Sequence, residues 1–225
     1  MPEKQFEHDD VLTARLKITE IFYSLQGESR NVGLPTVFIR LTGCPLRCHY
    51  CDTAYAFSGG DWMTVSQILE KVKKYKTRHV TVTGGEPLAQ KNCNTLLTRL
   101  CDLGYDVSLE TSGAIAVNEV DKRVVKVLDI KTPASGEEDR NILENLEFVT
   151  EQDQVKCVIC DENDYQWSRQ IINEHQLTNR CEVLFSPAYG MLDAVTLADW
   201  ILRDQLNVRF QIQLHKYLWG DKAGV

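Results

Sequence analysis

Three cysteines, Cys44, Cys48 and Cys51, lie close together in the segment GCPLRCHYCDT. Their C-x3-C-x2-C spacing places three thiolates on one short loop, enough to bind three irons of a 4Fe–4S cluster. The fourth iron is then left without a protein ligand. Because an iron with an open position can bind and activate a small molecule, the loop favours catalysis over passive electron storage.

Zinc is the main alternative occupant of this loop, and reduced thiols without a metal are another. Structural zinc sites usually close with a fourth Cys or His, and His49 is the nearest candidate. His49 directly follows Cys48, however, and so short a tether strains joint ligation of one ion.

The other five cysteines fit core positions better than a second metal site. Cys93 and Cys101 fall in a helical pattern and Cys181 begins an apolar segment, and free cysteine is among the most buried residue types. Cys157 and Cys160 form a C-x2-C pair within a segment that alternates like a strand. Residues three apart on a strand point to opposite faces, so this pair would not converge on one ion.

Length and composition indicate a single folded domain in a reducing compartment. The 225 residues are 43% hydrophobic, which suffices for one substantial core, and the net charge of −7 argues against a nucleic-acid partner. No apolar run approaches a bilayer span, and the charged N-terminus is unlike a signal peptide. We therefore expect a cytoplasmic protein without membrane association, whose eight cysteines stay reduced. A flexible tail is expected at 1–15 and a single domain at 16–225.

Apolar, β-branched segments alternate with amphipathic ones along this domain. Strands are predicted at 16–24, 36–42, 79–85, 106–113, 124–131, 154–160, 181–187 and 208–215. Helices are predicted from Thr64, with Gln67 completing a capping box, through 96–104, around 164–175 and at 192–204. Strands separated by helical patterns indicate a parallel sheet, so the fold class is α/β. About six such units, without a long linker, favour a partial, abbreviated (β/α)6-type barrel.

Polar clusters follow the predicted strands, where a parallel barrel carries its functional residues. They are the cysteine loop and the segments 83–87, 110–113, 129–131, 186–187 and 213–216. Because the carboxyl ends of parallel strands meet on one rim, we expect these clusters to form one site.

Several motifs resemble one enzyme family. The cysteine loop is the signature of the radical S-adenosylmethionine (SAM) superfamily. LQGES at 25–29, VFIRLTGC at 37–44, CDT at 51–53, TGGEP at 83–87, LETSG at 109–113 and LHK at 214–216 resemble the 7-carboxy-7-deazaguanine synthases of queuosine biosynthesis. The similarity extends over the chain after the tail.

This resemblance implies a carbon–nitrogen lyase that uses SAM catalytically. A 5′-deoxyadenosyl radical would take hydrogen from C6 of 6-carboxy-5,6,7,8-tetrahydropterin. The ring would contract to 7-carboxy-7-deazaguanine with loss of ammonia, and SAM would be regenerated. The resemblance also implies Mg²⁺ as a further cofactor, flavodoxin or ferredoxin as the reducing partner, and a homodimer.

The same resemblance implies roles for individual residues. Cys44, Cys48 and Cys51 would ligate the cluster, and Thr53 would bind Mg²⁺, a cation that prefers hard oxygen ligands. SAM would be bound by Tyr50, Asp52, Gly85, Glu86, Glu110, Asp129, Lys131 and Ser186. The pterin would be bound by Leu25, Gln26, Gly27, Glu28, Arg40, Thr83 and His215. Structural alternatives stay open: a turn at Thr53, a strand-to-helix turn at 84–87, a surface ion pair for Arg40 and a core histidine at position 215.

Two segments depart from the family pattern. Asp129-Ile130-Lys131 stands where many members read Ser-Pro-Lys, and Ser186-Pro187 stands where they read Gln-Pro. The family's C-terminal residue can help bind substrate, but this chain continues past the LHK motif, so that role is not transferred.

Two other functions remain open at this point. A glycyl-radical activating enzyme would share the cluster loop and a GGEP-like segment, but typically lacks the LQGE and LHK motifs. A small electron-transfer iron–sulfur protein would need a fourth cluster ligand and no rim of ligand-binding segments.

Overall fold

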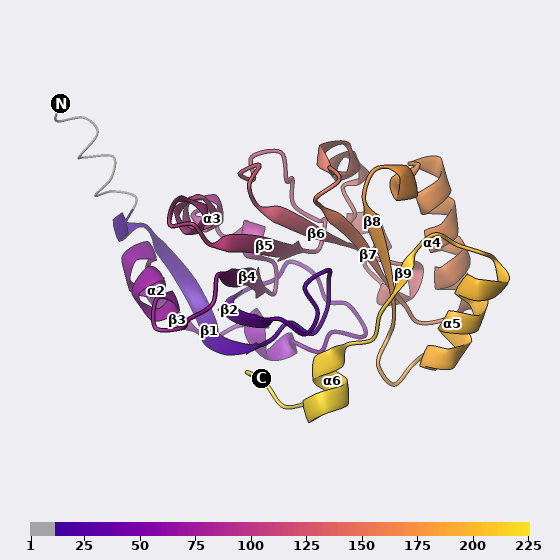
Figure 1. Ribbon diagram of the computed structural model, residues 1–225, viewed down its shortest axis with the longest axis horizontal. Coiled ribbons are helices and arrows are strands. Elements are labelled where there is room, and N and C mark those ends of the chain that lie inside the picture. Colours follow the sequence, from indigo (N-terminus) through magenta and orange to yellow (C-terminus); the bar gives the residue numbers. More distant parts are fainter. Residues whose placement is uncertain (1–11) are drawn as a thin grey trace.

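The computed structural model describes residues 12–225, and its strands form one curved nine-stranded sheet (Figure 1). The order across the sheet is β3-β1-β2-β4-β5-β6-β7-β8-β9. The strands are β1 (Arg15–Leu25), β2 (Pro35–Leu41), β3 (Asp61–Thr64), β4 (His79–Gly84), β5 (Asp106–Thr111), β6 (Val125–Ile130), β7 (Gln154–Ile159), β8 (Glu182–Pro187) and β9 (Arg209–Phe210). The tail predicted at 1–15 lies mostly outside the described residues, and β1 begins at its last position.

The strands from β2 through β4, β5, β6 and β7 to β8 are all parallel, as in a partial barrel. β1 and β3 extend one edge in the antiparallel sense, and the short β9 extends the other edge. The predicted α/β class and abbreviated barrel are therefore confirmed.

The helices are α2 (Val65–Val72), α3 (Cys93–Asp102), α4 (Glu162–Glu174), α5 (Ala194–Arg203) and α6 (Leu214–Trp219). Figure 1 shows α2 and α3 beside the β1–β4 end of the sheet and α4 and α5 beside β7–β9, whereas α6 and the C-terminus lie at the lower edge of the view. At α2 the predicted capping box is confirmed, because Thr64 Oγ1 accepts from the Gln67 amide and the Gln67 side chain accepts from the Thr64 amide. Within residues 12–225 no helix is long and apolar enough to cross a membrane.

Two connections in the described chain replace a helix by short turns, which is why the barrel is abbreviated. Residues 112–124 join β5 to β6 without a helix, and only 3-10 turns at Pro133–Ser135, Glu138–Arg140 and Leu143–Phe148 join β6 to β7. Asn145 organises this region: its side chain accepts from the Val117 amide and donates to the carbonyls of Gly113 and Ile115.

The predicted strand at 208–215 is wrong for most of its length. β9 covers only Arg209–Phe210, and α6 begins at Leu214. The chain leaves the sheet because Gln211 is buried, with its side-chain oxygen accepting from the Ser29 amide, and the Leu214 amide bonds to the Gly27 carbonyl. The polar residues that alternate in this segment thus bind the loop after β1 instead of continuing a strand.

The alternation along the parallel strands positions the site. On β2, β4 and β5 one set of side chains, including Ile39, Val82 and Leu109, is fully buried in the apolar core. The other set carries Arg40, Thr83 and Glu110, which all line one cavity. Side chains alternate between the two faces of a strand, so the same strands serve the core and the cavity.

Candidate functional site

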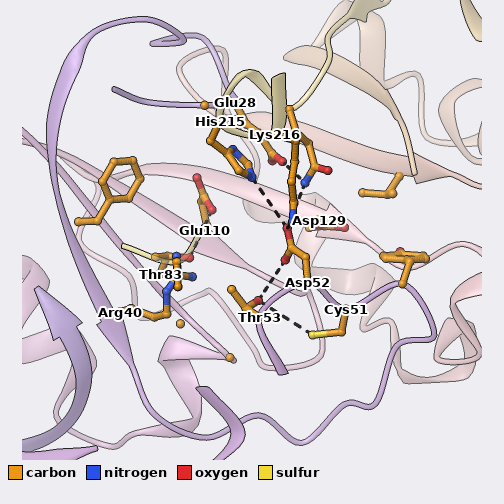
Figure 2. Close-up of a pocket in the computed structure, with 18 of the residues that line it drawn as sticks. Glu28, Arg40, Cys51, Asp52, Thr53, Thr83, Glu110, Asp129, His215 and Lys216 are labelled. Atoms are coloured by element: carbon orange, nitrogen blue, oxygen red, sulfur yellow. Dashed lines mark hydrogen bonds and ion pairs between the residues drawn. The ribbon is translucent and has the colours of Figure 1, made fainter. Parts of the chain in front are cut away.

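A cavity of about 550 Å³ lies at the carboxyl ends of the parallel strands. Its walls come from strands β2 and β4–β7, the loop after β1, the cysteine loop, α6 and the C-terminal residues 221–225. Figure 2 shows its labelled side chains turned toward a common centre. The residues predicted from the sequence that line it are Leu25, Gln26, Gly27, Glu28, Arg40, Cys44, Cys48, Tyr50, Cys51, Asp52, Thr53, Thr83, Gly85, Glu110, Asp129, Lys131 and His215.

The three cysteines of the loop share this cavity and are half-buried. The Cys51 amide donates to the Cys48 carbonyl at 3.1 Å, which tightens the loop. Burial raises the pKa of the Cys48 thiol to about 11, and it also raises the pKa of Cys44. Both thiols therefore need a bound metal to become thiolates at neutral pH.

The thiols fit a cluster better than a single ion. Among residues 12–225 no three His, Cys, Asp or Glu side chains gather closely enough to hold one metal ion. The three thiols nevertheless face one cavity, which leaves room for a group of four irons and four sulfides. The donor set is therefore suited to a 4Fe–4S cluster with one iron open to the cavity.

Gly85 allows the end of β4 to pack against the cysteine loop. A Cβ at this position would lie 2.4 Å from the Gly43 carbonyl oxygen and 2.6 Å from the Cys44 Cβ. The neighbouring Glu86 amide donates to the Gly43 carbonyl at 2.8 Å and holds the two segments together. A side chain at 85 would push the loop away from the strand.

We expect Gly85→Ala to lower bound iron about fivefold or more after reconstitution, because overpacking costs about 1–3 kcal/mol and falls on the ligand loop. Gly104→Ala is the control: Gly104 has φ +80° with open space around it, so it brings backbone strain without touching the loop. Iron and sulfide analysis of both purified variants checks this. Equal iron content in the two variants would contradict the packing role of Gly85.

Glu86, which the resemblance assigns to SAM binding, is not among the residues that line the cavity. It is fully buried and accepts four hydrogen bonds, from the Leu88 amide, Thr111 Oγ1, and the amide and hydroxyl of Ser112, at 2.5–3.0 Å. The carboxylate therefore ties the end of β4 to the end of β5. The segment that carries Glu110 is fixed by this link.

Ser186 is the other predicted SAM-binding residue outside the cavity wall. It lies opposite Val158 in the β7–β8 register and is 1% exposed, but it is not part of the cavity wall.

Asp52 connects the cysteine loop to α6. Its carboxylate lies 3.9 Å from His215 Nε2 and 3.8 Å from Lys216 Nζ, and it accepts weakly from Gln213 at 3.5 Å (Figure 2). Burial opposes ionisation of Asp52, but the contact with His215 and the charge of Lys216 lower its pKa below the ordinary value. Thr53 Oγ1 donates to Asp52 at 3.3 Å on the other side. The predicted SAM ligand is thus held by the C-terminal helix.

The loop after β1 packs on the same helix. Gln26 is buried, with its amide nitrogen donating to Thr81 Oγ1 at 3.1 Å. Gly27 lies so close to His215 that a Cβ would meet Nδ1 at 2.3 Å. The predicted pterin residues from the two ends of the chain are therefore brought into contact.

Arg40 is held by an ion pair inside the cavity wall. Its Nε donates to Glu20 Oε1 at 2.7 Å, and Tyr55 OH donates to the same oxygen at 2.7 Å. Its guanidinium lies over the rings of Phe22 and Tyr55. Burial, followed by the bond to Glu20, raises the pKa of Tyr55 to about 12, so this hydroxyl stays protonated as a donor. These contacts engage Nε and the guanidinium face, and Arg40 lines the cavity.

Lys156 is a site residue that the sequence reasoning missed. Its Nζ lies 2.5 Å from Glu28 Oε2 and 3.1 Å from Asp129 Oδ2, and Lys131 Nζ lies 3.0 Å from the other Asp129 oxygen. Burial opposes ionisation of Asp129, but the two ammonium groups lower its pKa. The sequence feature that could have identified Lys156 is its place in the middle of a largely apolar strand, QVKCVIC.

The C-terminal residues were also missed as wall residues. The positions from 221 to 225 lie along the cavity, and a Cβ added to Gly224 would come within 3.3 Å of Glu20 Oε2. The end of the chain therefore lies beside the ion pair of Arg40.

Comparisons with known proteins agree with this geometry. A family model described as the radical SAM superfamily matches residues 38–129. The 7-carboxy-7-deazaguanine synthase of Chlorobaculum tepidum is 44% identical over 213 residues, covering 93% of this chain and 97% of that protein. The enzyme of the same name from Koribacter versatilis is 42% identical over 219 residues, covering 91% and 97%. The crystal structure of QueE from Escherichia coli covers 88% of this chain and 94% of that chain with a TM-score of 0.74; at 22% identity it supports the fold alone.

Proposed function

This chain belongs to the 7-carboxy-7-deazaguanine synthase family of radical SAM enzymes, and we propose that it converts 6-carboxy-5,6,7,8-tetrahydropterin to 7-carboxy-7-deazaguanine. Ammonia leaves as the six-membered ring contracts. Because this radical SAM chemistry regenerates its cofactor, SAM is not consumed in proportion to product.

One observation carries the proposal. The thiols of the cysteine loop and the side chains suited to a pterin line the same cavity. Glu28 and Arg40 are charged groups for a polar ring and a carboxylate, and they reach this cavity from the loop after β1 and from β2, the strand that leads into the cysteine loop. A protein that binds a single metal ion, or an electron carrier, would not need side chains suited to a pterin beside its cysteine ligands.

The cluster and SAM, when bound, supply the radical chemistry that the protein itself lacks. Cys44, Cys48 and Cys51 hold the cluster, and the close packing at Gly85 keeps their loop against β4. Asp129 and Lys131 form an ion pair on the adjoining wall. These two charges would complement the carboxylate and the ammonium group of SAM. The chain thus binds and orients the reactants, so that one C–H bond lies next to the radical centre.

Recognition of the pterin rests on groups with remaining hydrogen-bonding capacity. Each Glu28 oxygen already accepts one bond, from Lys156 and from Gln213 Nε2 at 2.8 Å, and each has a lone pair left for a ring N–H donor. Arg40 lines the cavity, and its guanidinium is suited to pair with the 6-carboxylate as a planar fork. Burial raises the pKa of Glu110, whose carboxyl group also accepts a hydrogen bond from the Thr83 hydroxyl at 3.3 Å.

Mg²⁺ belongs beside Thr53. The Thr53 hydroxyl and the Asp52 carboxylate are adjacent oxygen donors on the cavity wall, and Mg²⁺ keeps several waters and substrate oxygens around few protein ligands.

Thr53→Ala should keep the cluster and raise the Mg²⁺ concentration needed for half-maximal rate about tenfold or more, since even an outer-sphere partner is worth about 10–100-fold in metal affinity. The rate is measured against Mg²⁺ concentration in wild type and variant, with cluster content matched. An unchanged Mg²⁺ dependence would remove Thr53 from the metal site.

We further propose a flavodoxin or a ferredoxin as the reducing partner, a homodimeric assembly and a cytoplasmic location. A low-potential electron is needed before SAM can be cleaved, and free thiols of the loop stay reduced in that compartment.

Anaerobic reconstitution tests the proposed function. The protein is loaded with iron and sulfide and given SAM, dithionite, Mg²⁺ and the tetrahydropterin, and the product is identified by mass spectrometry. Formation of 7-carboxy-7-deazaguanine in excess over SAM consumed supports the proposal. Accumulation of 5′-deoxyadenosine without that product would reject the substrate.

A further inference from the structure

Lys156 lines the cavity and forms ion pairs with two of its carboxylates. It sits on β7 directly opposite Asp129 in the β6–β7 register, and its side chain is 9% exposed. Burial opposes the ammonium form, but Asp129, Glu28 and Glu110 raise the pKa of Lys156 well above its ordinary value. The group therefore acts as a permanent cation and not as a proton donor.

The contacts of this cation reach both ligand-facing walls. Its Nζ pairs with Glu28 on the loop after β1 and with Asp129 at the end of β6, at 2.5 Å and 3.1 Å. Glu28 is 10% exposed and Asp129 is 17% exposed, so neither carboxylate has bulk water as its main partner. An ionised carboxylate at this depth needs a counter-charge.

β7 holds the same loop at a second point. Gln154 Oε1 accepts from the Arg30 amide at 2.7 Å, two residues beyond Glu28 along the chain. The Gln154 contact holds the loop at the Arg30 amide, whereas the Lys156 contact holds it at Glu28 through the carboxylate. The two functions can therefore be separated by substitution at position 156.

We infer that Lys156 is a positioning residue, which holds the Glu28 carboxylate oriented toward the pterin ring while it pairs with Asp129 on the SAM side. The inference rests on the proposed function, because it assumes that Glu28 binds the pterin ring. Because Lys156 acts on the substrate through Glu28, we expect its replacement to weaken pterin binding.

Equilibrium binding of 6-carboxypterin, followed by its own fluorescence under anaerobic conditions, gives the first readout. Lys156→Met should raise the Kd about 30-fold or more, in line with removal of one partner of a buried, hydrogen-bonded charge pair. The double variant Glu28→Gln with Lys156→Met should bind no more weakly than Glu28→Gln alone, because the cation has then lost the group through which it acts. Additive losses, or a Kd for Lys156→Met within threefold of wild type, would overturn the inference.

The chain offers a matched control in Lys126. This lysine pairs with Asp153 at 2.9 Å, both side chains are at least as buried as the Lys156 pair, and neither residue lines the cavity. Lys126→Met should lose stability yet bind 6-carboxypterin like wild type. If Lys156→Met does not accumulate as folded protein, Lys156→Gln, which keeps a polar end group, is judged by the same criteria.

A second readout does not depend on the substrate. Amide hydrogen exchange of residues 26–30 should quicken about tenfold or more in Lys156→Met and stay unchanged in Lys126→Met, because only the first lysine anchors this loop. If residues 26–30 exchange faster in Lys156→Met but the wild-type protein does not bind 6-carboxypterin, the anchoring role is supported and the proposed substrate is rejected. Unchanged exchange and unchanged binding in Lys156→Met would overturn the role of Lys156 and leave the proposed function standing.

Discussion

Cys48→Ala is expected to abolish both cluster assembly and SAM cleavage. Cys48 is the middle ligand of the loop, and its thiol faces the same cavity as Cys44 and Cys51. With two thiols left, the loop cannot hold three irons, and SAM loses the metal that activates it. Bound iron, the visible absorbance of the reconstituted protein and 5′-deoxyadenosine formation measure the loss.

Cys160→Ala is the control for this prediction. Cys160 is buried beside the carboxylate of Asp164 and lies outside the cavity wall, so its loss should leave the cluster in place. SAM cleavage retained in Cys48→Ala would disprove the ligand assignment. Loss of the cluster in Cys160→Ala would show a second metal site that the described residues do not indicate.

Arg40→Met should lower kcat/KM for the pterin about 100-fold or more while cluster content and SAM binding stay normal. Hydrogen bonds to charged groups contribute about 1.5–3 kcal/mol each, and a planar fork makes two of them to the substrate carboxylate. Methionine keeps most of the packing against Phe22 and Tyr55 but removes the charge. Steady-state rates over a range of pterin concentrations check the prediction.

Arg123→Met is the comparison for Arg40→Met. Arg123 is half-exposed and pairs with Asp121 and Asp102 away from the cavity, so this substitution removes an arginine without touching the site. Its kinetics should match wild type. If Arg40→Met retained wild-type kcat/KM, the carboxylate of the substrate would have to bind elsewhere in the cavity.

Local patterns allowed most of the elements and the cluster loop to be predicted from the sequence. The cysteine spacing, the Thr64 capping box and the apolar strands are short-range features, and each is read within a few residues. The six-strand parallel core followed from the alternation of strands and helices. The rim was predictable because parallel strands end on one side.

The contacts that hold the site together could not be predicted, because they depend on the register between strands. Lys156 meets Asp129 only when β6 and β7 pair at that position, and it meets Glu28 across 128 residues of chain. Glu86 follows β4 as the wall residues follow their strands, but it is buried and bonds to the end of β5, and Ser186 is buried within β8. Similarly, the segment before α6 was predicted as a strand, whereas Gln211 and Gln213 bind the loop after β1.

The fate of the hydrogen at C6 tests most directly whether one cavity brings the radical and the pterin together. The measurement uses 6-carboxytetrahydropterin deuterated at C6, with SAM recovered after turnover and examined by mass spectrometry. We predict 7-carboxy-7-deazaguanine as product and deuterium in the recovered SAM, since the abstracted atom passes to the 5′ carbon and exchanges there. Product formed without deuterium in SAM or 5′-deoxyadenosine would contradict direct abstraction at this position.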